Sequence, residues 1–169
     1  MTAIGALLAR VDGELFQNSW VVDDLAAAEA AMRSALGCDE FVGFEMDPKW
    51  QVRGETISSP MTCGFARSGN MQIELMQPLG TGGVVAEFLS RFGPGPHHLG
   101  VRVDDLDAAV TAAGVPAAMS ADFGSLRLAF LDTVDALGLY IELLDDPDGM
   151  LWATKPWRDD RTGSHKEDR

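Results

Sequence analysis

Alternating apolar and polar residues predict strands in this chain, and apolar residues at helical spacing predict helices between them. In the first half, a helix follows the candidate caps Asp23 and Asp24 and stops near Gly37. Turn residues occur at Asp47-Pro48 and at 68–70. The strands of this half are expected near 15–22, 40–45, 57–66 and 71–76. The predicted order is therefore βαβββ.

The same order returns in the second half. A helix is expected over 105–113, and strands near 98–103, 116–120, 126–131 and 139–144. The segment between the halves is rich in Gly and Pro, with helical spacing over 84–92. The predicted divisions are an N-terminal segment (1–14), a first module (15–80), a linker with a short helix (81–96), a second module (97–146) and a polar C-terminal tail (147–169). The last residues, GSHKEDR, are expected to be disordered.

Two phrases of the sequence occur twice. QNSWVVDDL at 17–25 matches HLGVRVDDL at 98–106 with an offset of 81, and MQIELMQ around Glu74 matches LYIELLD around Glu142. The repeat places Gln17 and His98 at equivalent positions. This internal repeat predicts an α+β fold of two βαβββ modules that contribute equivalent side chains to one site.

Strand alternation places Gln17, Glu74, His98 and Glu142 opposite the apolar residues that would face the helices. If the sheet curves so that these polar faces line one cup, the four side chains can converge. Two carboxylates, an imidazole and an amide oxygen suit a divalent ion such as Ni, Co, Zn, Mn or Fe. His97 has the opposite parity, and we expect it to begin the strand or to support a ligand.

An ion at this site could polarise a carbonyl group, and Glu142 or Glu74 could move a proton on the neighbouring carbon.

Other residues are open to two interpretations. Arg53 and Arg102 could hold a substrate carboxylate or phosphate, or could pair with acidic residues on the surface. Trp50, Met61, Met76 and Tyr140 could line a substrate pocket or fill the core. Glu45 and Glu55 are candidate additional bases near the mouth of the cup.

The composition argues against nucleic acid and membranes as partners, and we expect a small-molecule substrate. The net charge of −13 over 169 residues argues against nucleic acid, since few cations are present to neutralise phosphates. No apolar run reaches the roughly 18–20 residues that span a membrane. The N-terminus lacks the basic segment of a signal peptide, and the two cysteines have no metal-type spacing. We therefore expect a reduced, cytoplasmic protein that binds neither nucleic acid nor membrane.

The segments GPGPHHLGVRVDDLDAAV, MQIELMQPLG and LYIELLD resemble the vicinal oxygen chelate superfamily, and most of all its methylmalonyl-CoA epimerase-like branch. This superfamily also includes glyoxalase I, extradiol dioxygenases and bleomycin-resistance proteins. The resemblance covers about 15–145 and implies paired βαβββ modules forming a cup-shaped incomplete barrel around a metal. It implies ligands on the first and last strands of each module, here Gln17, Glu74, His98 and Glu142. It also implies a homodimer.

The ligand order departs from that of the epimerases, which usually have His first and Gln second. The order Gln, Glu, His, Glu of this chain resembles that of glyoxalase I. The leading hypothesis is a metal-dependent epimerase, isomerase or lyase that acts through an enolate-type intermediate. The alternatives are a non-catalytic binding or resistance protein, a metal-dependent dioxygenase, which Gln17 disfavours, and a non-catalytic dimeric scaffold.

Overall fold

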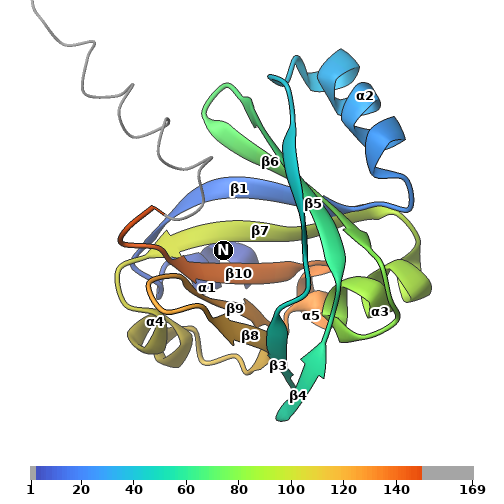
Figure 1. Cartoon of the computed structure of the whole chain (residues 1–169). Coiled ribbons are helices and arrows are strands. Elements are labelled where there is room, and N and C mark those ends of the chain that lie inside the picture. Colours follow the sequence, from blue (N-terminus) through green and yellow to red (C-terminus); the bar gives the residue numbers. More distant parts are fainter. Residues whose placement is uncertain (1–2, 150–169) are drawn as a thin grey trace, which may run out of the picture.

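A single curled sheet of ten strands forms the body of the molecule (Figure 1). The computed structural model describes residues 3–149, so most of the predicted polar tail and its predicted disorder lie outside the described residues. The strands are β1 (Gly13–Val21), β2 (Val42–Met46), β3 (Lys49–Val52), β4 (Glu55–Ser58), β5 (Met61–Ser68), β6 (Met71–Pro78), β7 (Gly95–Val103), β8 (Ala117–Asp122), β9 (Arg127–Leu131) and β10 (Tyr140–Asp145). The helices are α1 (Ala3–Leu8), α2 (Leu25–Leu36), α3 (Gly83–Phe92), α4 (Leu106–Ala113) and α5 (Val134–Leu137).

The two halves of the chain meet at the centre of this sheet. The strand order is β2-β5-β6-β1-β7-β10-β9-β8-β3-β4. β1 and β7 pair antiparallel with each other, and each pairs in parallel with the last strand of its own half, β6 and β10 respectively. The sheet curls into a half-barrel, which confirms the predicted α+β cup.

The hairpin β3–β4 departs from the predicted order. It comes from the first half of the chain, but β3 pairs with β8 of the second half. The single strand predicted over 57–66 is wrong, because β4 ends at Ser58 and β5 starts at Met61. Pro60 lies between them and has no N–H to continue a ladder. β3 itself was not predicted, since its four residues give too short an alternation.

The repeated phrase VDDL proves to be a helix start. The side chains of Asp24 and Asp105, the second Asp in each copy, accept hydrogen bonds from the backbone N–H groups three residues later. The helices end at Gly37 and Gly114, whose φ angles of 62° and 66° favour glycine. The repeat therefore encodes matching helix caps beside the strands that carry the candidate site.

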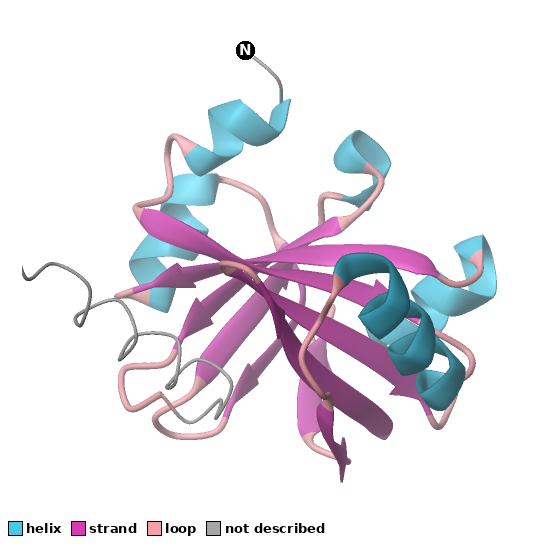
Figure 2. Ribbon diagram, turned by 90° about the horizontal axis from the view of Figure 1, so that it is seen from above, coloured by secondary structure: helices cyan, strands magenta, loops and turns pink. Residues whose placement is uncertain are grey.

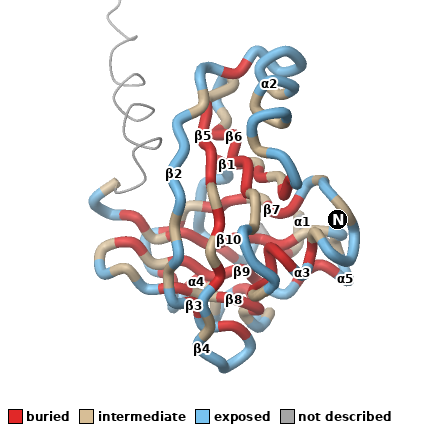
Figure 3. The backbone as a smooth tube through the Cα atoms, turned by 45° about the vertical axis from the view of Figure 1, so that its right-hand side comes forward, coloured by how far each residue is buried: buried red, intermediate tan, exposed pale blue. Residues whose placement is uncertain are grey.

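The helices lie at the periphery of the curled sheet (Figure 2), and Val85 of α3 reaches the inner cavity. On the outer face, Val101, Ile141 and Leu143 pack with α4 in one apolar cluster. A larger cluster occupies the inner face and includes Val85 and Phe88 of α3. Many residues of β1, β7 and β10 are buried, whereas α2 is largely exposed (Figure 3). Among residues 3–149, no helix is long and apolar enough to cross a membrane.

Candidate metal centre

The four central strands of the sheet each contribute one polar side chain to the inner face. Gln17 lies on β1, Glu74 on β6, His98 on β7 and Glu142 on β10. All four are buried, and the most exposed of them, Glu74, keeps 8% of its surface accessible. Alternation explains this burial for Glu142, whose neighbours Ile141 and Leu143 face outward and pack with α4, whereas irregularities in the pairing of β1 with β7 interrupt the alternation near Gln17 and His98.

Three oxygen atoms surround the Nε2 atom of His98. The distances from Nε2 are 2.9 Å to Oε1 of Gln17, 3.2 Å to Oε2 of Glu74 and 3.4 Å to Oε2 of Glu142. The structure therefore brings the four side chains predicted from strand parity into direct contact. Each comes from a different strand, so the cluster depends on the meeting of the two halves.

Two residues that carried no assigned ligand role in the sequence hold this cluster in place. Gln17 donates its Nε2 hydrogen to Oε1 of Gln72 at 2.6 Å, which turns its own Oε1 toward His98. His97 places Nδ1 at 3.0 Å from Nδ1 of His98. Gln72 could have been found from the sequence, because it shares the face of Glu74. For His97, the structure agrees with the expectation that it supports His98.

The electrostatics of the cluster separate the two histidines. Burial lowers the pKa of His98, but the charges and hydrogen bonds of Glu142 and Glu74 outweigh it and raise the pKa to about 9. Burial, aided by the charge of His98, holds the pKa of His97 well below its usual value. His98 is therefore charged at neutral pH, and His97 is neutral and accepts the Nδ1 hydrogen of His98. This arrangement leaves Nε2 of His98 facing the three oxygens.

Glu142 is the carboxyl group whose environment most favours proton transfer. Its burial raises its pKa, Glu74 raises it further, and the nearby imidazolium of His98 opposes both effects. The net pKa is above the ordinary value for a glutamate. A buried carboxyl group with a raised pKa can take up and return a proton closer to neutral pH.

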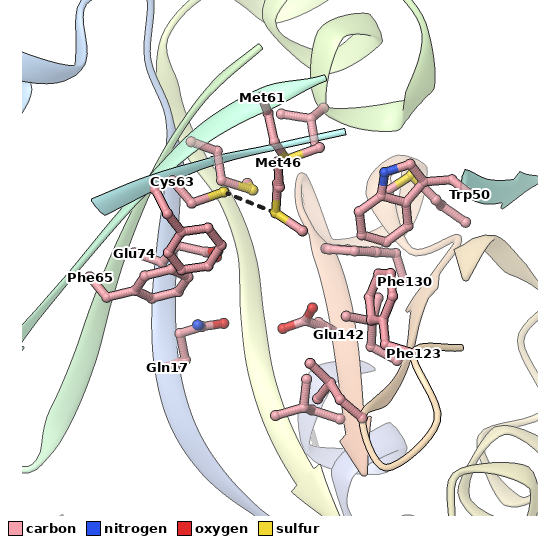
Figure 4. Close-up of a pocket in the computed structure, with 17 residues that line it drawn as sticks. Gln17, Met46, Trp50, Met61, Cys63, Phe65, Glu74, Phe123, Phe130 and Glu142 are labelled. Carbon is pink, nitrogen blue, oxygen red and sulfur yellow. Dashed lines mark hydrogen bonds between the residues drawn. The ribbon is translucent and has the colours of Figure 1, made fainter. Parts of the chain in front are cut away.

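A cavity of about 360 Å³ opens beside the cluster (Figure 4). Gln17, Glu74 and Glu142 reach its wall, whereas His98 does not line it. The remaining lining residues are apolar or sulfur-containing. They are Phe44, Met46, Trp50, Met61, Cys63, Phe65, Met76, Val85, Met119, Phe123, Leu126, Leu128, Phe130 and Leu144. Burial raises the pKa of the Cys63 thiol, and the nearby carboxylates raise it further, so this residue behaves as apolar lining.

The two carboxylates have equivalent neighbours in the two halves. Glu74 is paired across the sheet with Phe65, and Glu142 with Phe130. Gly100 is the cross-strand partner of both Gln17 and Glu142. A Cβ atom on Gly100 would lie 2.7 Å from Oε1 of Gln17, so the absence of a side chain makes room for that amide. A glycine inside a strand signals such a close approach, and this signal was present in the sequence.

The other sequence-predicted site residues divide into two groups. Trp50, Met61 and Met76 line the cavity. Arg53, Arg102 and Tyr140 do not. Arg53 forms an ion pair with Glu87 at 2.9 Å, and Arg102 with Glu14 at 2.6 Å.

Tyr140 packs instead against the rings of His97, Phe88 and Phe130. The candidate bases Glu45 and Glu55 are exposed and do not line the cavity. For Glu45 the reason is alternation, since both of its neighbours on β2 face inward. We therefore assign no role in the proposed chemistry to Arg53, Arg102, Tyr140, Glu45 or Glu55.

The chemistry of the donor set suits a divalent metal ion. Oxygens from two carboxylates and an amide surround one nitrogen of the His98 imidazole, and its second nitrogen is hydrogen-bonded to His97. A hydrogen bond to the second nitrogen is usual for a histidine that binds a metal. In the described residues, no group of three or more His, Cys, Asp or Glu side chains is spaced to hold an ion as it stands. The oxygens instead share the Nε2 hydrogen of His98, which occupies the point where their negative charge converges.

The protein has two equivalent halves and a polar cluster where their first strands meet. These features place it in the class of cup-shaped proteins that are built from paired modules. A sequence model of the Glyoxalase/Bleomycin resistance protein/Dioxygenase superfamily matches residues 16–116, more than half of the chain. The chain belongs to this superfamily, as its sequence motifs predicted. Among proteins with curated descriptions, none matches the chain.

Several solved structures share the fold. The methylmalonyl-CoA epimerase of Mycobacterium tuberculosis is 29% identical, with a TM-score of 0.58 over 79% of this chain and 87% of that one. A variant of the Streptomyces coelicolor methylmalonyl-CoA epimerase in complex with 2-nitronate-propionyl-CoA is 21% identical, with a TM-score of 0.53 over 77% and 94%. A mutant of 4-hydroxymandelate synthase from Streptomyces coelicolor is 20% identical, with a TM-score of 0.54 over 78% and 48%.

Proposed function

We propose that this protein is a metal-dependent enzyme that moves a proton on the carbon next to a carbonyl group, as an epimerase, isomerase or lyase. The observation that carries the proposal is the convergence of Gln17, Glu74, His98 and Glu142 beside an otherwise apolar cavity. Membership of the superfamily and the similarity to a methylmalonyl-CoA epimerase support an enzyme of this kind. Assembly as a homodimer and a cytoplasmic location stay predictions.

Gln17, Glu74, His98 and Glu142 would hold the ion. When bound there, a divalent metal supplies a Lewis acid that draws electrons toward a substrate carbonyl oxygen and so acidifies the neighbouring C–H bond. Glu142 accepts the proton from that carbon and returns it, because burial raises the pKa of its carboxyl group. Glu74 is the second candidate for this role. The apolar wall keeps water away from the carbon while it lacks the proton.

Exchange of substrate hydrogen for solvent deuterium tests the proposal before the natural substrate is known. Metal-loaded protein is incubated in D₂O with acyl-CoA thioesters, hemithioacetals and aromatic ketones, and the loss of the C–H signal is followed by NMR. The variant Glu142→Gln should retain metal by elemental analysis and lose about 100-fold or more of the exchange rate, as expected for a general base. Undiminished exchange in this variant would remove Glu142 from its role.

Glu45→Gln is the matched control. It makes the same chemical change on β2, but Glu45 is exposed and does not line the cavity. Its exchange rate should equal that of the unmodified protein. If Glu45→Gln lost as much of the exchange rate as Glu142→Gln, the loss would follow from removing any carboxylate and would not show a specific role for Glu142.

A non-catalytic binding or resistance protein is the second candidate. One observation favours it: most of the cavity wall is apolar, which suits the retention of an apolar ligand. This candidate predicts little stoichiometric metal in the purified protein and no deuterium exchange. A metal-dependent dioxygenase would instead consume oxygen in the same assays.

A further inference from the structure

We propose that the cavity takes an uncharged, largely apolar, aromatic carbonyl compound rather than a substrate that carries its own carboxylate. This inference rests on the proposed function, because it names the substrate class of the same site. The volume of about 360 Å³ suits a small molecule and lies within the usual range of ligand pockets.

The charge distribution in the cavity wall excludes a second anion. The charged residues that line it are Glu74 and Glu142, both acidic, and no Arg or Lys of the described chain joins them. The two arginines that could have bound an anion, Arg53 and Arg102, are engaged by Glu87 and Glu14 and do not line the cavity. Two carboxylates already balance the charge of one divalent ion. A substrate carboxylate in the apolar part of the cavity would therefore be buried without a partner, which is unfavourable.

The apolar part of the wall favours a flat ring. Phe65 and Phe130 lie across the strands from the two carboxylates, and Trp50 packs edge-on against Phe130 with ring centroids 6.5 Å apart. Such aromatic walls bind a ring by edge-to-face and stacked contacts.

Methionine and cysteine side chains form the rest of the wall beside β5. Figure 4 shows Met46, Met61 and Cys63 together, and the sulfur atoms of Cys63 and Met46 are 3.9 Å apart. Met76 is the cross-strand partner of Cys63 and completes the group. Thioethers are polarizable and adapt to the edge of a ring. The sulfur group lies beside β5, and the rings of Phe65 and Phe130 adjoin the two carboxylates, so an aromatic ring can bind next to a carbonyl group that faces the donor oxygens.

Two probes that differ only at the apolar end test this inference. 4-Methylacetophenone and 4-acetylbenzoate share the carbonyl end, and a methyl group of the first is replaced by a carboxylate in the second. Calorimetric titration of the metal-loaded full chain should give at least about tenfold tighter binding of 4-methylacetophenone, a difference of about 1.4 kcal/mol. Equal or tighter binding of 4-acetylbenzoate, or no binding of either compound, would overturn the inference.

A charge placed in the wall provides the matched variants. Met46 is partly buried on the edge strand β2, so a lysine there can keep its ammonium group hydrated at the cavity mouth. Met46→Lys should abolish the preference for the neutral probe. Val42→Lys adds the same charge on the same strand outside the cavity lining and should leave the preference intact. Equal effects of the two variants would show that the preference reflects overall charge and would overturn the inference.

Deuterium exchange at the acetyl group separates this inference from the proposed function. Tight binding of 4-methylacetophenone without exchange of any candidate substrate would overturn the proposed function and support the ligand class. Exchange confined to 4-acetylbenzoate would overturn the ligand class and support the proposed function.

Discussion

Substitution of Gly100 by alanine should weaken metal binding without removing any polar group. A Cβ atom at this position would lie 2.7 Å from Oε1 and 2.8 Å from Cβ of Gln17, and 3.2 Å from Cε1 of Phe16. The first two contacts are too short to persist, so the side chain of Gln17 must move. Its hydrogen bonds to His98 and to Gln72 would then be displaced. The donor set would lose its amide oxygen while both carboxylates stay in place.

The size of the effect follows from the crowding. Forcing an extra methyl group into a packed site costs about 1–3 kcal/mol. If the strain is relieved by moving Gln17 out of the donor set, metal affinity falls by about 5- to 150-fold, since each 1.4 kcal/mol is about a factor of ten. The stabilisation that saturating metal gives against unfolding falls by the same free energy. The assay is competition with a chromophoric chelator, together with thermal unfolding with and without metal.

Two glycines on the same pair of strands serve as controls. A Cβ atom on Gly13 would be equally crowded, at 2.6 Å from Cγ1 of Val101, but it meets no atom of the donor set. Gly13→Ala should therefore lower stability without changing metal affinity. Gly95→Ala should change neither, because a Cβ atom there meets nothing within 4 Å. The reasoning is refuted if Gly100→Ala loses stability equally with and without metal and binds metal normally.

Two further predictions concern the metal-free protein. The His98 imidazole should titrate near pH 9 by NMR, because the carboxylates raise its pKa to about 9. Since this exceeds the value of about 6.5 in unfolded chains, the stability from this group is complete below about pH 6.5 and is lost as the pH rises through 9; a midpoint at 6.5 or below would contradict the charge cluster. Asp24→Ala and Asp105→Ala should each cost about 0.5–2 kcal/mol in the free energy of unfolding, because each removes a helix N-cap. Urea titration measures this loss, and an effect confined to one of the two would contradict the equivalence of the halves.

Strand parity predicted which polar residues share a face, and the reason is physical. When alternate residues of a strand pack against a helix, as Ile141 and Leu143 do, the residues between them must point to the opposite face of the sheet. Glu142 between them must then point into the cup. The internal repeat predicted that the residues of the two halves come together, because the equivalent strands β1 and β7 pair with each other. The convergence of Gln17, Glu74, His98 and Glu142 was therefore predictable, although their role as metal ligands stays a proposal.

Which residues line the cavity was harder to predict from the sequence. Trp50 lies on β3, a strand too short to predict, and reaches the cavity because the hairpin crosses to pair with β8 of the other half. Met119 enters the wall from β8 through the same crossing. The ion pairs that hold Arg53 and Arg102 away from the cavity join residues 34 and 88 positions apart. Long-range pairing of this kind leaves no local pattern in the chain.

The repeat also explains why its two carboxylates are not interchangeable. The position equivalent to Gly100 in the first half is Ser19, which pairs across the sheet with Glu74 and with His98. The hydroxyl of Ser19 is buried and has no hydrogen-bond partner among the described residues. Glu74 therefore lies beside an unused hydroxyl group, whereas Glu142 lies beside a residue with no side chain at all. Symmetry brings two similar carboxylates to one point, and the pKa of Glu142, raised by burial, makes it the better candidate to accept and return a proton.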